Sequence, residues 1–365
     1  AAAFLLLGLQ PGDRVAVALP NLPASCELML GILRAGGIIV GLPWGADAVQ
    51  VAASLAACPP RYVVTAEGPG GQALVAAAPA GGLILVDLLA DLPFLLRILG
   101  RLGGGRRAGP AGDGPRPRAP RHRRWDRLLA QARPGGEPLL SAESPAMELP
   151  LASGVLRFTH GHLLSGAQML RLWLSDAVPG EDSWLPLLPL GSPLGLVLIL
   201  GAAPLARARV LLLPRPDAES LAQLCRWLPP AYAFSDAATL RTLAEDPQLP
   251  EADLGTLRAW IVCEGLGADE REAFETATGL DLCQGLAPAE AAGLLLCNPI
   301  NGQRRADAYG LLLPGASACT VHGADGSDSL AFHAPNLAGS GWRQLELALT
   351  ADADGYLYPM LPPAG

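Results

Sequence analysis

The first 65 residues alternate between short apolar runs and stretches with helical periodicity. The predicted elements are, in order, a strand over Arg14–Leu19, a helix over Pro23–Ala35, a strand over Ile38–Gly41, a helix over Ala46–Ala57 and a strand over Arg61–Thr65. Such alternation is typical of right-handed βαβ units on a largely parallel sheet. We therefore expect an α/β subdomain over residues 1–96, N-terminally truncated because the opening Ala1–Leu9 run has the pattern of the end of a helix.

The alternation returns after residue 140 and predicts a second α/β subdomain over residues 141–305. Its predicted strands are Ala146–Leu151, a run before Pro186, Arg209–Leu213, Ala231–Ser235 and Arg258–Cys263. Its predicted helices are Gly161–Leu174, Leu194–Gly201, Ala218–Trp227, Asp236–Ala244 and Asp269–Thr278. From residue 306 to 365 the apolar runs shorten, and Gly-Ala-Asp-Gly at 323–326 is typical of a turn, so we expect a small β-rich subdomain there.

Residues 97–140 separate the two α/β patterns. Eleven Arg lie between positions 97 and 133 among many Gly and Pro, with little apolar periodicity outside 125–129. This composition favours a solvated insertion. Binding of the basic run to acidic lipid or nucleic acid is the alternative.

The charge inventory narrows the possible chemistry. All 26 basic residues are Arg, and with 34 acidic residues the formal net charge is −8. The acidic balance argues against a general affinity for nucleic acid. The absence of Lys removes the ammonium group that often neutralises migrating phosphates, and the planar guanidinium of Arg replaces it only with a different geometry.

The cysteines and the long apolar run indicate in which cellular compartment we expect the protein. The seven Cys include no C-x-x-C pair, which favours free thiols in a reducing cytoplasm. The chain does not start with the pattern of a signal peptide. The uncharged run Leu185–Ala206 is interrupted by four Pro and three Gly, so we expect a strand, a turn and a core helix there and no transmembrane segment.

Five segments spread over the chain have the order, and nearly the spacing, of the motifs of one family. They are Leu9–Asn21, Gly31–Gly37, Asn298–Arg305, Leu313–Gly315 and Asp354–Leu357. The chain thus resembles the AMP-forming acyl-CoA synthetases of the adenylate-forming (ANL) superfamily, and its Arg-rich insertion sits where the long-chain fatty-acid–CoA ligases place one. The resemblance implies an α/β fold, the large domain of such a synthetase, with two parallel-sheet α/β subdomains, a small β-rich subdomain and the C-terminal domain absent.

The resemblance also implies ATP, Mg²⁺ and CoA as reactants or cofactors, and a fatty acid or other carboxylic acid as the substrate. In that family a Ser, Thr and Gly-rich loop ending in Pro-Lys-Gly wraps the phosphates with N–H groups and hydroxyls. In Leu151–His160 the Thr-His end of this motif persists, but about five or six loop residues are missing and the Lys has no counterpart. The remaining candidates for the phosphate site are Ser153, Gly154 and Thr159.

A second family motif, Tyr-Gly-Leu-Thr-Glu, flanks adenine with its aromatic ring, touches phosphate with its Thr and holds Mg²⁺ with its Glu. The resemblance places Leu286, Ala289 and Glu290 at the first, fourth and fifth positions. Glu290 is therefore the candidate catalytic residue and Mg²⁺ ligand, with a solvated Glu at a helix start as an equal alternative. Gly265 falls in the family's segment beside adenine, next to Glu264, whose charge would repel a nucleotide.

The acyl-binding segment is also altered. The family's Pro-Leu-Phe-His segment near the acyl tunnel corresponds to Pro189–Ser192, so small groups replace an aromatic ring and an imidazole. Ser192 and the nearby Gly195 are the candidates for the substrate site. His160 and His162 lie two positions apart and do not share a helix face, which argues against a zinc pair.

Three functions remain open from the sequence. The first is an ATP-dependent acid–thiol ligase that forms an acyl-adenylate and then an acyl-CoA, in a copy that is impaired or inactive. The second is a non-catalytic acyl-binding or scaffold pseudoenzyme, motivated by the apolar runs between residues 185 and 213. The third is a fragment of a decaying gene, so whether the chain is an enzyme stays undecided at this point.

Overall fold

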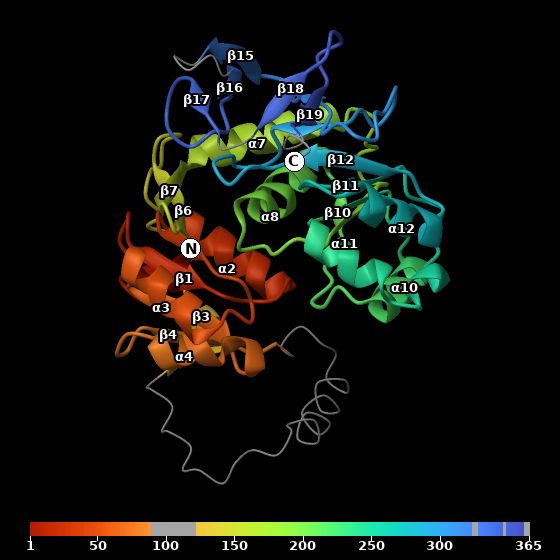
Figure 1. Cartoon of the computed structure of the whole chain (residues 1–365). Helices are drawn as coiled ribbons and strands as arrows, with labels where there is room; N and C mark the ends of the chain where they lie inside the picture. The colour runs from red at the N-terminus through yellow and green to blue at the C-terminus, as the bar shows by residue number, and fades with distance from the viewer. Residues whose placement is uncertain (89–121, 323–327, 346–347, 361–365) are drawn as a thin grey trace. The chain divides into compact units, whose positions relative to one another are not determined.

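A computed structural model describes residues 1–88, 122–322, 328–345 and 348–360. The chain divides into two compact units, the first formed by residues 1–140 with 145–155 and the second by residues 141–144 with 156–365 (Figure 1). The boundary therefore falls within one strand, β7 (Gly154–Thr159). Each unit is described by itself below.

The first unit contains a parallel sheet. Its strands are β1 (Arg14–Val17), β2 (Ile38–Gly41), β3 (Tyr62–Ala66), β4 (Leu83–Val86), β5 (His122–Arg124) and β6 (Pro145–Leu151), and the sheet order is β5-β4-β3-β1-β2-β6-β7. All pairings from β5 to β6 along this order are parallel. The central strand β1 lies in the core, since Val15, Ala16 and Val17 have no exposed surface. This confirms the α/β character predicted for the N-terminal part of the chain.

The two helices predicted over residues 23–35 and 46–57 are present among the helices of the first unit. The helices of this unit are α1 (Ala2–Leu6), α2 (Pro23–Arg34), α3 (Ala48–Ala57), the short 3-10 turn η1 (Pro69–Gly71), α4 (Gln72–Ala77) and α6 (Trp125–Gln131). The helix predicted from Ala46 begins two residues later, because the Asp47 carboxylate accepts hydrogen bonds from the N–H groups of Val49 and Gln50 and so caps the first turn.

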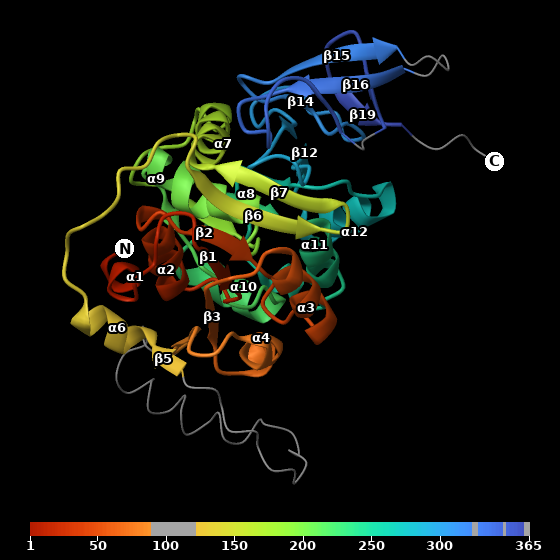
Figure 2. The same ribbon diagram turned by 90° about the vertical axis from the view of Figure 1, so that its left-hand side faces the viewer.

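Two segments near the Arg-rich insertion differ from the expectation. Residues 122–131 form β5 and α6, so the C-terminal part of the predicted insertion belongs to the first sheet and its helical cover, whereas residues 97–121 lie outside the described residues (Figure 2). The strand β6, expected to open the second α/β subdomain, pairs with β2 of the first sheet. A buried carboxylate on β6, Glu148, holds it there through an ion pair with Arg14 at 2.5 Å.

The second unit contains a mixed sheet. Its strands are β8 (Ser183–Pro186), β9 (Arg209–Val210), β10 (Tyr232–Ser235), β11 (Ala259–Val262), β12 (Leu282–Leu286), β13 (Leu296–Cys297) and β14 (Leu311–Leu312), in the order β14-β13-β12-β11-β10-β8-β9. The strands β8 to β12 are parallel, and β13 and β14 continue the sheet in antiparallel fashion. Parallel order of this kind requires a helical crossover between successive strands.

The helices of the second unit provide those crossovers. They are α7 (His160–Trp173), α8 (Pro193–Val197), the π-helical turn η2 (Leu198–Ala202), α9 (Ala203–Ala206), α10 (Ala218–Trp227), α11 (Ala237–Ala244), the short 3-10 turn η3 (Leu249–Glu251) and α12 (Ala268–Thr278). In Figure 1, α10, α11 and α12 lie together on one side of the sheet. Their apolar residues form one buried cluster with the strands, which includes Trp260 and Phe274 at a ring-centroid distance of 4.9 Å.

The C-terminal part of the second unit is rich in short strands, as predicted. The strands β15 (Ser317–His322), β16 (Asp328–His333) and β17 (Arg343–Gln344) form one antiparallel sheet, and β18 (Leu349–Ala351) pairs with β19 (Leu357–Pro359). The turn predicted at 323–326 lies outside the described residues.

In the part of the chain that the structure describes, no helix has the length and apolar character needed to cross a membrane. The uncharged run Leu185–Ala206 forms the end of β8, a loop and the successive helical segments α8, η2 and α9. The predicted strand, turn and core helix are thus present, although the helical part continues to Ala206, beyond its predicted end at Gly201.

Candidate functional site

The parallel strands of the second sheet end along one common edge. Because β8, β10, β11 and β12 run in the same direction, the segments that follow them leave the sheet on the same side. Gly265 follows β11, Leu286 ends β12, Ala289 and Glu290 come directly after it, and Ser192 follows β8. In open α/β sheets this carboxyl edge is the usual place for ligands. The structure therefore places five of the nine predicted site residues along one edge.

Gly265 lies against a side chain that the sequence did not single out. A Cβ atom built on Gly265 would come 2.7 Å from the phenolic oxygen of Tyr309, so the glycine leaves room for that ring. Burial raises the pKa of Tyr309, which keeps the phenol protonated. The Tyr309 backbone N–H donates to Leu357 of β19 at 2.8 Å. The C-terminal hairpin β18–β19 thus anchors a hydroxyl at the carboxyl edge.

Glu264, whose charge was expected beside adenine, has a hydrogen-bonding partner within the second unit. The Glu264 carboxylate accepts a hydrogen bond of 3.4 Å from the backbone N–H of Ala237, the first residue of α11. A negative charge at this end of a helix is favourable because the free N–H groups there carry partial positive charge. Glu264 therefore contributes to the start of α11, in addition to any effect on a bound anion.

Glu290 is half-buried and lies in a turn between β12 and β13, so it is not at a helix start. Its backbone carbonyl accepts a hydrogen bond of 2.8 Å from the N–H of Ala338. Nearby, the buried amide of Asn336 donates to the carbonyls of Ala292 and Leu294 at 3.3 and 3.2 Å. The loop that contains Asn336 and Ala338 consequently fixes the turn of Glu290, a role that sequence reasoning missed.

Thr159 caps α7. Its hydroxyl accepts a hydrogen bond of 3.3 Å from the N–H of His162, and the Nδ1 atom of His162 accepts one of 3.2 Å from the N–H of Thr159. This is a reciprocal capping box with His in the place usually taken by Glu or Gln. Burial lowers the pKa of His162, against an opposing hydrogen bond to the backbone of Gly339. The hydroxyl of Thr159 is therefore already engaged in the helix start.

Ser153 and Gly154 occupy a very short connection in the first unit. Only Ala152 and Ser153 separate β6 from β7, and Gly154 begins β7 with a φ of +137°. Both Ser153 and Gly154 are exposed. A two-residue turn offers few free N–H groups, whereas a phosphate cradle needs several that converge on one anion. The described turn is therefore much smaller than a phosphate-wrapping loop.

The two candidates for the acyl site have structural roles at the start of α8. The Ser192 hydroxyl accepts from the N–H of Gly195 at 3.0 Å and donates to the carbonyl of Pro189 at 2.8 Å. A Cβ on Gly195 would lie 2.0 Å from that same carbonyl oxygen, so no larger residue fits. Ser192 and Gly195 thus define the bend after β8.

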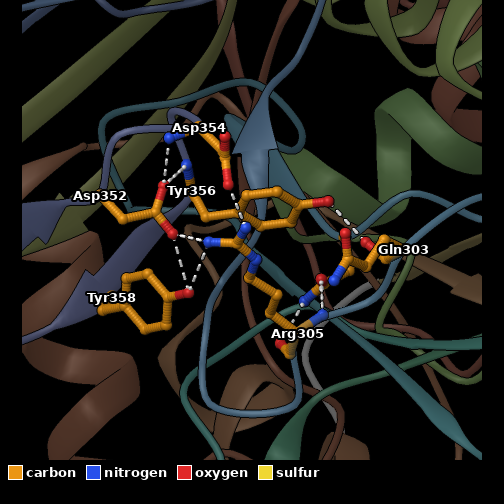
Figure 3. Close-up of polar contacts among 7 residues, drawn as sticks. Gln303, Arg305, Asp352, Asp354, Tyr356 and Tyr358 are labelled. Atoms are coloured by element: carbon orange, nitrogen blue, oxygen red, sulfur yellow. Dashed lines mark hydrogen bonds and ion pairs between the residues drawn. The ribbon is translucent and has the colours of Figure 1, made fainter.

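Two of the segments that carry the family resemblance meet at Arg305, as Figure 3 shows. The Arg305 guanidinium pairs with the carboxylates of Asp352 and Asp354 and lies 4.2 Å from the ring centroid of Tyr356. It also donates to the Tyr358 hydroxyl at 3.2 Å. We call these five residues the Arg305 cluster. It ties the loop after β13 to the β18–β19 hairpin.

The described residues do not form a resident metal site. No group of three or more His, Cys, Asp or Glu side chains in the described ranges is arranged to hold a metal ion. Beside Glu290, Ala289 and Pro288 have no side-chain oxygen. Mg²⁺ in nucleotide-dependent enzymes is held by one or two carboxylates together with substrate phosphates. Glu290 can therefore supply one ligand to an ion that arrives with a nucleotide, but the site does not fit a permanently bound ion.

Both the sequence and the fold of the chain are similar to those of one class of protein. Residues 1–95 match the family described as "AMP-binding enzyme". The resemblance to the AMP-forming, adenylate-forming acyl-CoA synthetases is thereby confirmed, and so is the predicted α/β large-domain fold.

Individual relatives make the similarity more specific. The chain is 23% identical over 378 residues to the long-chain-fatty-acid–CoA ligase of Bacillus subtilis (strain 168), covering 98% of this chain and 66% of that protein. Its fold is similar to the anthranilate CoA ligase AuaEII in complex with anthranoyl-AMP, at a TM-score of 0.77 and 16% identity, covering 98% of this chain and 70% of that one. It is also similar to ATP-bound MatB from Rhodopseudomonas palustris, at a TM-score of 0.73, 19% identity and the same coverages. The chain thus spans about two thirds of the length of the curated relative.

Proposed function

We propose that this chain is an adenylation domain of the fatty-acid–CoA ligase type in which the handling of ATP is impaired. By similarity, the intact reaction would be attack of a fatty-acid carboxylate on the α-phosphate of ATP, with release of pyrophosphate, followed by transfer of the acyl group from the adenylate to the thiol of CoA, with release of AMP. The cytoplasm is the proposed compartment, since all seven cysteines are free thiols.

The observation that carries the proposal is the two-residue connection between β6 and β7. Phosphoryl and adenylyl transfer depend on preorganised donors aimed at the charge that develops on the phosphates. Ala152 and Ser153 supply one hydroxyl and two N–H groups, and no Lys exists anywhere in the chain to add a compact positive charge. Weak binding and slow reaction of ATP are the expected consequences.

The carboxyl edge of the second sheet supports the same conclusion. Leu286 is buried at the end of β12 and offers no flat aromatic face for adenine, and Ala289 offers no hydroxyl for a phosphate. Glu290 is the remaining polar side chain of that motif. A single carboxylate without neighbouring donors repels a triphosphate unless Mg²⁺ bridges the two.

The direct test is an assay of pyrophosphate release with ATP, Mg²⁺ and a panel of fatty acids of different chain lengths. We expect no release above the rate of the same mixture without protein. The Glu290→Gln variant, which removes the carboxylate, is compared with Glu272→Gln, which removes an exposed carboxylate of α12. Release that depends on a fatty acid and is lost in Glu290→Gln alone would show that the domain is active and that the proposed impairment is wrong.

A further inference from the structure

A basic pocket lies in the first unit, on elements that contribute nothing to the carboxyl edge of the second sheet. It has a volume of about 530 Å³ and is formed by α1, β5 and α6. Figure 2 shows these three elements next to one another. The lining residues are Leu6, Leu7, His122, Arg123, Arg124, Arg127, Leu128 and Gln131. Its volume falls within the range of small-molecule sites.

The three arginines of this pocket differ in their partners. Arg124 is neutralised, since its guanidinium pairs with Asp87 at 3.3 Å and with Asp126 at 3.1 Å. Within the described part of the chain, Arg123 and Arg127 have no ion pair, and both side chains are exposed. A guanidinium without a carboxylate partner is well suited to bind a phosphate or carboxylate, because its N–H groups match two oxygens at once.

Three leucines give the pocket an apolar side next to the arginines. Leu6 is 53% exposed although it faces this pocket, and Leu7 and the buried Leu128 complete the apolar side. An exposed leucine next to unpaired arginines offers a ligand both an apolar contact and a charged contact. Burial of apolar ligand surface on such a wall adds to the affinity in proportion to the area covered.

We propose that this pocket binds an amphiphilic anion, a phosphate or carboxylate group attached to an apolar chain. Arg123 and Arg127 hold the anionic group, and Leu6, Leu7 and Leu128 contact the chain. A lipid headgroup and a soluble phosphate ester share this chemistry. The pocket shares no residue with the proposed nucleotide site, so the proposal is testable whether or not the chain binds ATP.

The test is isothermal titration of the full chain with octyl phosphate and, separately, with inorganic phosphate. We expect octyl phosphate to bind at least about tenfold more tightly than inorganic phosphate, because only the former uses the leucines. The double variant R123Q/R127Q is expected to weaken octyl phosphate binding by at least about tenfold, and higher salt is expected to weaken binding to the wild type.

The matched control is Arg133→Gln. Arg133 follows α6, does not line the pocket, and donates to the backbone carbonyls of Ala130 and Ala132. This variant is expected to bind octyl phosphate like the wild type. Equal binding of the two phosphates, no binding of octyl phosphate, or equal losses in R123Q/R127Q and Arg133→Gln would each overturn the proposal.

Vesicles distinguish the two sources of the ligand. Phosphatidylcholine vesicles with and without phosphatidic acid are mixed with the wild type and with R123Q/R127Q and then sedimented. Co-sedimentation that requires both phosphatidic acid and the two arginines supports a lipid headgroup as the ligand. Octyl phosphate binding without such co-sedimentation supports a soluble amphiphile.

Discussion

The side-chain amide of Asn298 makes hydrogen bonds to several backbone groups of its loop. Replacing this side chain gives a quantitative test of the packing around it. Asn298 is only 2% exposed. Its amide nitrogen donates to the carbonyls of Ala308 and Arg305 at 2.7 and 3.3 Å, and its amide oxygen accepts from the N–H of Arg305 at 3.0 Å. Asn298→Ala therefore takes the Asn298 partner from the Ala308 carbonyl and from the Arg305 N–H, whereas the Arg305 carbonyl keeps a hydrogen bond of 3.0 Å from the N–H of Ala308.

The expected loss of stability follows from these two groups, the Ala308 carbonyl and the Arg305 N–H. A buried polar group without a partner costs about 1–3 kcal/mol. Ala308 is fully buried and bears the larger part, whereas the backbone of the half-exposed Arg305 regains some hydrogen bonding to water. The free energy of unfolding of the second unit is thus expected to fall by about 2–4 kcal/mol.

The assay is urea unfolding followed by tryptophan fluorescence. With a slope of about 3 kcal/mol per M, the Asn298→Ala midpoint is expected to fall by about 1 M. Gln303→Ala is the control in the same loop, because the Gln303 side chain is exposed and only its backbone carbonyl accepts a hydrogen bond, from Tyr356. A midpoint of Asn298→Ala equal to that of Gln303→Ala would refute the assigned role of the Asn298 amide.

Two further predictions concern other parts of the second unit. Gly195→Ala places a methyl group 2.0 Å from the carbonyl oxygen of Pro189 and is expected to lower the free energy of unfolding by at least about 2 kcal/mol. Gly255→Ala is the control, since the nearest atom to a Cβ built on Gly255 lies at 3.5 Å, and it should cost less than about 1 kcal/mol in the same urea experiment. Similar costs for the two variants would contradict the bend described at Gly195. Burial lowers the pKa values of His160 and His162 below 6.5. Below pH 6.5 the unfolded chain therefore binds more protons than the folded chain. The free energy of unfolding is thus expected to fall as the pH drops from 6.5 toward these lowered pKa values. His162→Gln keeps a residue that can close the capping box and should reduce this loss between pH 7 and 5.5, whereas an unchanged pH profile would show that His162 does not titrate as described.

The sequence predicted the regular elements well because their signals are local. The alternation of apolar runs and helical periodicity placed β1, β2 and β3 within two residues of the described strands. The start of α3 was missed by two residues, since the capping side chain of Asp47 was not considered. The β6 strand was assigned to the wrong sheet, because periodicity predicts a strand but does not say which neighbour it pairs with.

The sequence predicted those residues of the candidate site that lie in recognisable motifs, and it missed those that only the folding of distant segments brings there. The motif comparison identified Glu290 and Gly265, and the parallel sheet brings them to one edge. It did not identify Tyr309 or Asn336, whose positions depend on contacts with segments 42 residues away or more. The Arg305 cluster was missed for the same reason, although both of its segments had been recognised as family motifs.

Under the proposed function, the chain keeps the fold of an adenylate-forming ligase and lacks most of the contacts that hold ATP. Isothermal titration of the full chain with ATP and Mg²⁺ tests it most directly, with MatB from Rhodopseudomonas palustris, which has been solved with ATP bound, as the positive control. We expect no saturable binding of ATP with a Kd below about 1 mM, which corresponds to a binding free energy weaker than about −4 kcal/mol. Saturable binding with a Kd well below 1 mM, weakened in Glu290→Gln and unchanged in Glu272→Gln, would contradict it.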